Sequence, residues 1–255
     1  MRRRSGGPFI RLDRLPTAMY VVRGRADSIA ADRRVTDRLH SWAAEGEPAV
    51  RVWTPHRQVA FGRRDRRLEG YDRARDRARE RGFPPVERSV GGRAVAYDGE
   101  TTLAFARADP VEDFRRGTDE RYERATTAVE RGLEGLGLDL ERGEPDDSFC
   151  PGTHSLSVVD DESTGRKVVG IAQRVRQDAA LTAGIVLVDA RAALADVLEA
   201  VYDALGVGFD PATVGTVASA GGTGNPHAVR VALEAALVDD AEPRVRSVTA
   251  VLDDN

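Results

Sequence analysis

Short apolar runs, each bounded by turn-forming residues, constrain the fold of this chain more than any other feature. Runs of this kind predict strands. They cover Ala18–Val22, Ala49–Trp53, Gln58–Phe61, Ala94–Tyr97, Leu103–Ala106, Ser155–Val159, Lys167–Gln173 and Thr182–Val188. Between them, apolar side chains recur every three or four positions and predict helices. These stripes run from Leu68 to Ala78, from Tyr122 to Leu133, from Leu194 to Leu205, and from a start at Asn225-Pro226. This order predicts an α+β (mixed α/β) fold, with a mixed, mostly antiparallel sheet flanked by helices.

The connections between the runs predict which strands are neighbours. Pro55 with His56, Asp98 with Gly99, and the segment from Asp160 to Gly165 each separate two runs closely enough for a hairpin. We expect a single domain over residues 1–255, because this length is ordinary for one domain. Its core would cover about residues 18–205, and residues 206–255 would add a helix and a possible last strand over 245–252.

Composition excludes several classes of function. The net charge is −4 with 31% charged residues, so the surface carries both signs and not the basic footprint of a nucleic-acid-binding protein. A single cysteine, Cys150, excludes an internal disulfide and a multi-cysteine metal site, so we expect no metal and a reducing, cytoplasmic location. Arg11, Asp13 and Arg14 interrupt the stretch after the basic amino terminus, so we expect neither a signal peptide nor a membrane span.

An arginine-rich stretch extends from Arg63 to Arg81, where arginine alternates with aspartate and glutamate. A solvated, ion-paired helix face is the ordinary explanation of such a pattern. A docking surface for an acidic protein partner is the alternative.

Lys167 and Cys150 are the candidates for chemistry. Lys167 is the single lysine among 38 Lys and Arg residues. Codon bias explains such a survival equally well, but an ammonium is a compact charge that fits where a planar guanidinium does not. Pro151 and Gly152 follow the cysteine and predict that its thiol lies at an exposed bend, although a lone cysteine is commonly a small buried apolar residue. Pairing of the two strands that flank residues 160–165 would bring Lys167 toward Cys150, where an ammonium favours the nucleophilic thiolate.

Small residues suggest room for a ligand. Gly91 and Gly92 enter the strand that starts at Ala94, and a residue without a Cβ permits close approach of a ligand or backbone. Gly170 and Ala172 fall on one face of the Lys167–Gln173 strand, because side chains alternate along a strand. An elongated apolar ligand would fit over that face.

Together these segments resemble the superfamily of lipoate-protein ligase A, octanoyltransferase and biotin protein ligase. The resemblance covers about residues 18–205. It rests on Arg88 with Gly91-Gly92-Arg93-Ala94-Val95, on Lys167 with Gly170, Ala172 and Gln173, and on Val59-Ala60-Phe61-Gly62-Arg63. The segment Phe149-Cys150-Pro151-Gly152 resembles the octanoyltransferases and lipoyl amidotransferases in which such a cysteine carries an acyl thioester.

The resemblance implies a catalytic domain of the biotin/lipoate protein ligase type and an acyltransferase of protein lipoylation. Cys150 would take an octanoyl or lipoyl group from acyl carrier protein or the glycine-cleavage H protein. A lysine of a lipoyl domain, in a 2-oxoacid dehydrogenase complex or the H protein, would then accept it. Lys167 would lower the pKa of the cysteine and hold the acyl carbonyl, and Arg88 would position the carrier arm or the pocket wall. Substrate would also meet Gly91, Gly92, Ala94, Gly170 and Ala172.

Two other functions remain open on the sequence. The first is an ATP-dependent lipoate-protein ligase without the accessory domain, which would need ATP and Mg, whereas the transferase needs no cofactor. His154 and Ser155 stand where such ligases have an Asn-Asp pair, and little chain follows Val188 for an accessory domain. The second is a non-catalytic protein that binds an acyl or lipoyl carrier. Glu87, Val90 and Tyr97 also depart from residues common in the superfamily.

Overall fold

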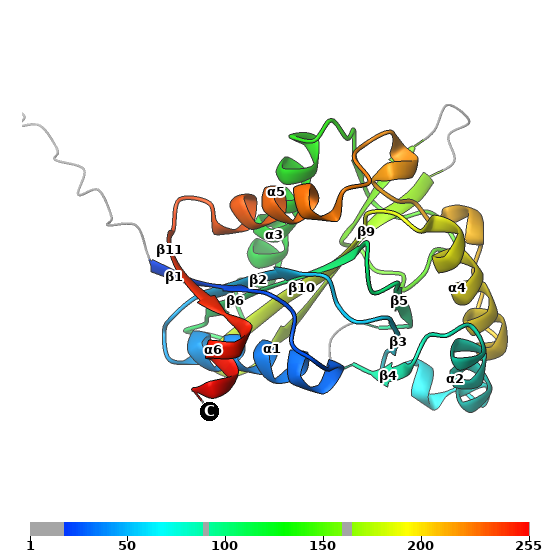
Figure 1. The fold of residues 1–255 in the computed structure, drawn as a ribbon, viewed down its shortest axis with the longest axis horizontal. Coiled ribbons are helices and arrows are strands. Elements are labelled where there is room, and N and C mark those ends of the chain that lie inside the picture. The colour runs from blue at the N-terminus through cyan, green and yellow to red at the C-terminus, as the bar shows by residue number, and fades with distance from the viewer. Residues whose placement is uncertain (1–17, 89–91, 160–164, 255) are drawn as a thin grey trace, which may run out of the picture.

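The computed structural model describes residues 18–88, 92–159 and 165–254. An eight-stranded sheet forms the centre of the molecule, with strand order β11-β1-β2-β6-β10-β9-β8-β7 (Figure 1). Strand β1 pairs in parallel with β2 and β11, and every other neighbouring pair is antiparallel. The strands are β1 (Ala18–Arg23), β2 (Ala49–Trp53), β6 (Thr102–Pro110), β7 (Glu141–Arg142), β8 (Ser155–Val159), β9 (Gly165–Val175), β10 (Ala179–Leu187) and β11 (Glu242–Ser247).

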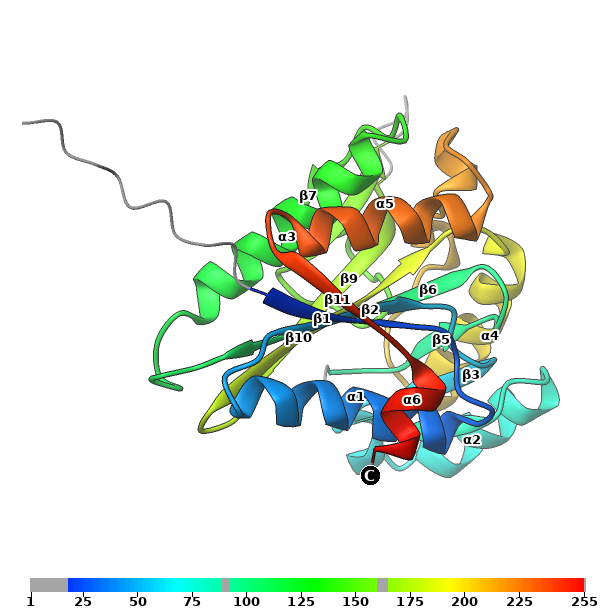
Figure 2. The same ribbon diagram turned by 60° about the vertical axis from the view of Figure 1, so that its left-hand side comes forward.

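Helices cover both faces of this sheet. Helices α3 (Thr118–Glu134) and α5 (Pro226–Val238) lie on one face, while α1 (Ile29–Ala44) and the short α6 (Val248–Asp253) lie on the other (Figure 2). Side chains alternate between the two faces, so Val50 and Val52 of β2 pack in the cluster under α3 and α5, whereas Ala49 packs under α1. Several residues on the α1 face of the sheet are small, among them Ala104 and Ala183, and a cavity lies between them and the helix.

A second, three-stranded sheet stands beside one end of the large sheet. Its order is β4 (Pro85–Glu87), β3 (Gln58–Phe61) and β5 (Val95–Tyr97). Helices α2 (Tyr71–Glu80) and α4 (Arg191–Leu205) pack on each other and on this sheet, and one apolar cluster joins them to Ile185 and Leu187 of β10. Three one-turn helices complete the elements: Asp65–Arg67, Pro211–Thr213 and Ala218–Ala220. The candidate functional site lies where the two sheets meet.

The predicted mixed, mostly antiparallel sheet flanked by helices is confirmed. Each of the eight predicted strands overlaps an observed one, and Asn225 caps α5, with its side chain accepting from the His227 amide at 2.9 Å. Helix α1 was not predicted, although Ala31, Val35, Leu39 and Trp42 follow a helical period and are buried. The assignment of residues 1–255 to a single domain stays a prediction.

Two of the three expected hairpins are wrong. Strands β2 and β3 belong to different sheets, as do β5 and β6. After β2 the chain turns away from the large sheet, where His56 Nε2 lies 2.8 Å from the Ala26 carbonyl. After β5, the Asp98 carboxylate accepts from the amides of Thr101 and Thr102, which closes a loop that redirects the chain into β6. The third hairpin is confirmed, because β8 and β9 are antiparallel neighbours.

The possible last strand over residues 245–252 is wrong in its second half. Strand β11 ends at Ser247, and the Ser247 hydroxyl accepts from the Ala250 amide at 3.1 Å. This cap starts helix α6 at Val248, and Val248 and Val251 are buried one helical turn apart. Among the described helices, none is long and apolar enough to span a membrane.

Candidate active site

Cys150 lies on a sharp bend between β7 and β8, and the bend is strained. Its φ is +44°, a left-handed conformation that costs a residue with a Cβ about 1–2 kcal/mol. The Tyr202 hydroxyl of α4 holds the bend, since it accepts from the Cys150 amide at 2.6 Å and donates to the Ala94 carbonyl of the small sheet at 3.0 Å. Tyr202 is fully buried, so these groups have no competing water. The structure thus ties the cysteine to two other elements, and its thiol is only partly exposed.

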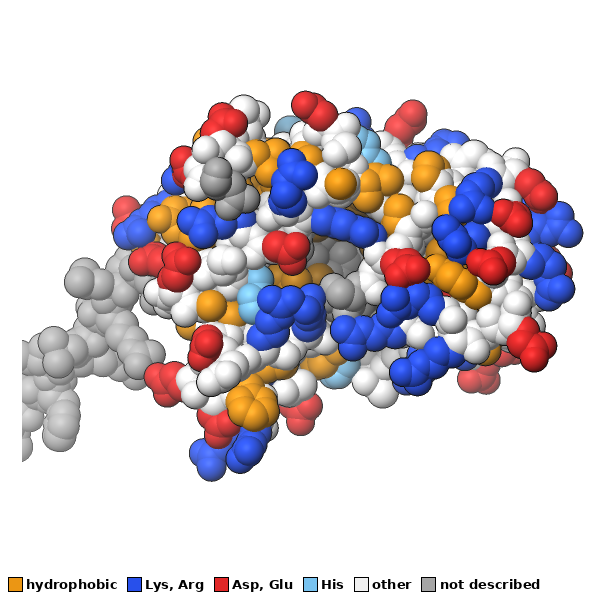
Figure 3. Space-filling view, turned by 90° about the horizontal axis from the view of Figure 1, so that it is seen from below, with side chains coloured by type: hydrophobic (Ala, Val, Ile, Leu, Met, Phe, Trp, Pro, Cys, Tyr) orange, Lys and Arg blue, Asp and Glu red, His pale blue; other side chains and the backbone are white. Residues whose placement is uncertain are grey.

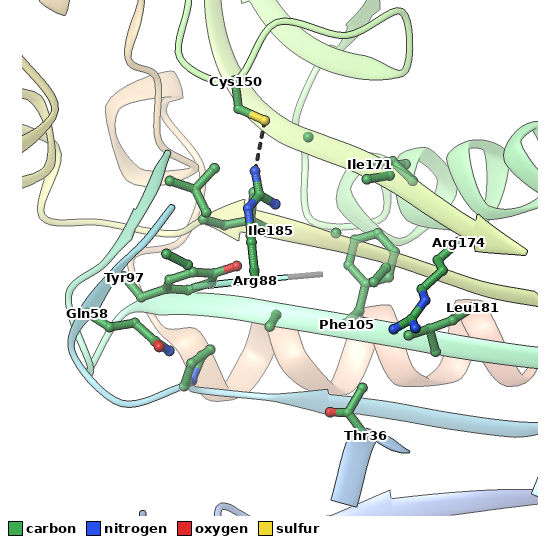
Figure 4. Close-up of a pocket in the computed structure, with 18 of the residues that line it drawn as sticks. Thr36, Gln58, Arg88, Tyr97, Phe105, Cys150, Ile171, Arg174, Leu181 and Ile185 are labelled. Atoms are coloured by element: carbon green, nitrogen blue, oxygen red, sulfur yellow. Dashed lines mark hydrogen bonds between the residues drawn. The ribbon is translucent and has the colours of Figure 1, made fainter. Parts of the chain in front are cut away.

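Positive charge and amide groups surround the sulfur atom. Arg88 Nη2 donates to Cys150 Sγ at 2.9 Å, which Figure 4 shows as the dashed line, and the Arg93 amide donates to it at 3.4 Å. Burial alone would raise the pKa of the thiol, but the Arg88 charge and the Arg93 amide outweigh it, and the pKa is lowered. The thiolate is the nucleophilic form of cysteine. The geometry therefore presents an activated sulfur.

Lys167 lies beneath the bend and contacts its backbone. Its side chain is 1% exposed, and Nζ donates to the carbonyls of Phe149 and Cys150 at 3.0 and 3.1 Å. The ammonium also lies 4.9 Å from the centre of the Phe149 ring. Its charge contributes to the lowered pKa of Cys150, but less than that of Arg88. The sequence predicts that Lys167 activates the thiol, whereas in the structure the Arg88 guanidinium is the cation that contacts the sulfur.

Glu144 completes the support of the bend and was missed by the sequence analysis. Its carboxylate accepts from Lys167 Nζ at 3.1 Å, from the Gly152 amide at 2.8 Å and from the Ser155 hydroxyl at 3.2 Å. One carboxylate thereby joins the lysine to the residues that follow the cysteine. No motif marks Glu144 in the sequence, because its partners come from three separate positions along the chain.

An elongated cavity of about 330 Å³ opens beside the sulfur and is large enough for a small ligand. It runs between the large sheet, helix α1 and the small sheet, and Figure 4 shows side chains from all three pointing toward it. Small or apolar residues of β6, β9 and β10 form its floor: Ala104, Gly170, Ala172, Leu181, Ala183, Gly184 and Ile185. Ile29, Asp32, Arg33, Thr36 and Asp37 of α1 line the opposite wall, and Gln58, Ala60, Val95 and Tyr97 close the side against the small sheet.

The predicted small residues fall in different places. Gly170 and Ala172 line the cavity with Arg88, Cys150 and Lys167. Gly184 also lines the cavity and was not predicted from the sequence. Glycine is required there, because a Cβ would lie 2.3 Å from the Phe105 ring. Gly92 and Ala94 are not among the lining residues: Gly92 is near the sulfur through its amide, and Ala94 is buried in the apolar cluster under α4.

Close backbone approach is required at Gly62 and not at Gly92. A Cβ on Gly62 would lie 2.1 Å from the Gly92 carbonyl oxygen, whereas one on Gly92 would meet only the Arg64 side chain at 3.9 Å. The fully buried Asp65 fixes this approach, because its carboxylate accepts from the Gly62 amide at 2.9 Å and contacts Arg93 Nη1 at 3.4 Å. These contacts hold the segment that surrounds the sulfur. Gly91 and Val90 lie outside the described residues.

The departures from the superfamily pattern also have defined places. Glu87 and Tyr97 line the cavity. His154 stacks on the Tyr122 ring at a centroid distance of 3.7 Å, and Ser155 donates to Glu144. Within residues 18–88, 92–159 and 165–254, no three His, Cys, Asp or Glu side chains are grouped so that they would hold a metal ion.

The fold of this chain is that of a known class of catalytic domains. Residues 26–218 match the lipoyl protein ligase A/B catalytic domain family, and the chain belongs to this family. In solved structures, the fold is similar to that of lipoate-protein ligase A bound with ATP, with a TM-score of 0.70 and 19% identity over 93% of this chain and 92% of that one. It is also similar to a lipoate protein ligase from Thermoplasma acidophilum, with a TM-score of 0.69 and 17% identity over 93% and 90% of the two chains.

Curated relatives have names that specify a transfer reaction. The chain is 28% identical to the octanoyl-[GcvH]:protein N-octanoyltransferase of an Exiguobacterium species over 66% of its own length and 58% of the relative's. It is 33% identical to the protein of the same name from Bacillus velezensis over 54% and 47% of the two lengths. It is 30% identical to the lipoyl-[GcvH]:protein N-lipoyltransferase of Listeria monocytogenes over 49% and 43%. The chain thus matches a little over half the length of the first of these relatives and less of the other two.

Proposed function

We propose that this chain is a cysteine-dependent acyltransferase that moves an octanoyl or lipoyl group between carrier proteins through a thioester on Cys150. The observation that carries the proposal is the Arg88–Cys150 contact of 2.9 Å beside an apolar cavity. A lowered thiol pKa supports a nucleophilic role, and the small residues of the floor fit an alkyl chain. The names of the curated relatives agree with this reaction.

In the first half-reaction the Cys150 thiolate attacks the acyl carbonyl carbon. A carbon–sulfur bond forms, the bond to the donor breaks, and the donor leaves as a thiol or amine after taking a proton from solvent. The Arg88 guanidinium stabilises the thiolate before attack. Lys167 Nζ, directed at the carbonyls of the bend, is the candidate donor to the oxyanion after a small shift toward the substrate.

In the second half-reaction a lysine amine of the acceptor domain attacks the thioester. The amide forms, the lysine nitrogen loses a proton, and the Cys150 thiolate is regenerated. Neither step requires ATP or a metal ion. Gly170 and Ala172 would contact the alkyl chain, and the amides of Gly92 and Arg93 would stabilise the sulfur anion.

For the donor and acceptor, we propose the glycine-cleavage H protein and the lipoyl domains of 2-oxoacid dehydrogenase complexes. The names of the relatives favour the H protein over acyl carrier protein as donor. A reducing compartment such as the cytoplasm would keep the single thiol in its active form.

The test is the intact mass of the protein after incubation with octanoylated H protein in the absence of ATP. We expect an adduct of one octanoyl group that maps to Cys150 and is released by hydroxylamine. The Cys150→Ser variant should carry no such adduct. An unmodified wild-type protein that instead lipoylates a lipoyl domain with free lipoate and ATP would establish the ligase. Saturable carrier binding with neither reaction would establish a non-catalytic binding protein.

A further inference from the structure

Arginine side chains gather at the mouth of the cavity. Figure 3 views the molecule from the side of α1 and β4, and Lys and Arg side chains border a hollow at the centre of this face. Arg33 and Arg174 line the cavity itself. Arg174 is partly desolvated, and the charges of Arg176 and Arg63 are close enough to lower its pKa further, while Asp37 opposes them. We refer to Arg33, Arg63, Arg174 and Arg176 as the mouth arginines.

The structure divides the arginine-rich stretch of residues 63–81 into two parts. On α2, the arginines at positions 75, 77 and 79 each pair with a carboxylate three residues away along the helix. This part is the ordinary ion-paired surface. Arg63 precedes α2, and its charge acts on Arg174 at the mouth. Within the described ranges, neither Arg63 nor the exposed Arg176 forms an ion pair.

Such a cluster of like charges is unfavourable in the free protein, and it stands out in a chain whose net charge as a whole is −4. Positive potential around a concave site attracts a negatively charged partner and accelerates its association. Cys150 lines the cavity, so a carrier protein must insert its acylated side chain into the cavity while its surface contacts the residues around the cavity entrance.

We propose that the mouth arginines form a docking surface for an acidic face of the carrier domain that delivers the acyl group. This inference rests on the proposed function, because the carrier domain would deliver the acyl group that is transferred to Cys150. The surface of the carrier that contacts the mouth arginines would be rich in carboxylates around its acylated lysine.

The test compares two double variants of equal charge change. Arg63→Glu with Arg176→Glu alters the mouth. Arg131→Glu with Arg244→Glu is the matched control, because these two arginines lie on α3 and β11, are about half exposed and each pair with one surface carboxylate. Binding of octanoylated H protein is measured by calorimetry over a series of salt concentrations. Acylation by octanoyl-N-acetylcysteamine, a small uncharged thioester, and by octanoyl-coenzyme A is measured by intact mass.

We expect the mouth variant to weaken H-protein binding about tenfold at low salt and to reduce its salt dependence, because rim charges act mainly through long-range attraction. Acylation by the small thioester should be unchanged in both variants. An H protein whose acidic residues beside the modified lysine are changed to lysine should bind the mouth variant better than it binds the wild type.

Equal binding by the two double variants would overturn the proposal. Slower acylation by octanoyl-coenzyme A with unchanged H-protein binding would also overturn it, and would show that the arginines bind phosphate. Failure of the small thioester to acylate the wild type would refute the proposed function instead, while the binding measurement would still decide the docking surface.

Discussion

Replacement of Arg88 by glutamine tests the origin of the activated thiol. The guanidinium donates to Cys150 Sγ at 2.9 Å, and glutamine keeps a polar but shorter side chain while removing the charge. A hydrogen bond to a charged group contributes about 1.5–3 kcal/mol. Because the Cys150 residue as a whole is partly exposed, we take the lower end of this range, which corresponds to roughly a tenfold smaller thiolate population at neutral pH.

The assay is the rate of Cys150 alkylation by iodoacetamide as a function of pH. In the wild type the lowered thiol pKa keeps the thiolate, and therefore the reactivity, down to lower pH than in an ordinary cysteine. The Arg88→Gln profile should move toward higher pH, with about a tenfold slower reaction at pH 7 and the same rate at high pH, where both proteins are fully ionised.

Arg93→Gln is the matched control for this experiment. Arg93 contacts the sulfur through its backbone amide, so the substitution removes an equal charge nearby but leaves that contact in place. We expect its alkylation rate to change less than about threefold. Superimposable profiles for Arg88→Gln and the wild type would refute the assignment of the activating charge to Arg88.

Three further substitutions probe the bend, the lysine and the cavity. Tyr202→Phe leaves the Cys150 amide and the Ala94 carbonyl without this partner, so urea denaturation should show a free energy of unfolding lower by about 2 kcal/mol, and acylation of Cys150 should be slower. An unchanged urea midpoint of unfolding would contradict a role of Tyr202 in holding the bend. Lys167→Arg retains the positive charge, but the larger guanidinium does not fit the space of a lysine side chain that is 1% exposed, so the rate of acyl transfer should fall at least about a hundredfold. Near-normal turnover would show that only the charge matters. Ala172→Leu fills space at the floor of the cavity and should lower the acylation rate with octanoyl donors, relative to butyryl donors, by roughly a hundredfold. The reason is that each displaced methylene costs about 0.8 kcal/mol of burial. Equal losses for both donors would place the alkyl chain elsewhere.

Local patterns in the sequence were sufficient for most elements. The strands and four of the longer helices follow from hydrophobic periodicity, which is a property of neighbouring residues. The same holds for the helix cap at Asn225 and for the bend at Cys150, where the following proline fixes its own φ and glycine permits a turn. Helix α1 shows the same periodicity and was accessible to the same reasoning. The failed hairpins could not be recognised in this way, because a short connection does not reveal whether its strands join one sheet or two.

The sequence by itself determined the candidates for the chemistry, because a single lysine, a single cysteine and a glycine-rich strand stand out without any coordinates. Only the tertiary structure decided which side chains surround them. Arg88 meets the sulfur from 62 positions away, Tyr202 meets the bend from 52, and Glu144 joins Lys167 to the residues that follow the bend. Such contacts depend on how the two sheets and α4 pack together, and long-range packing leaves no periodic trace in the chain. For this reason the sequence points to the unusual lysine as the activating charge, whereas the larger contribution to the lowered pKa of Cys150 comes from one of many arginines.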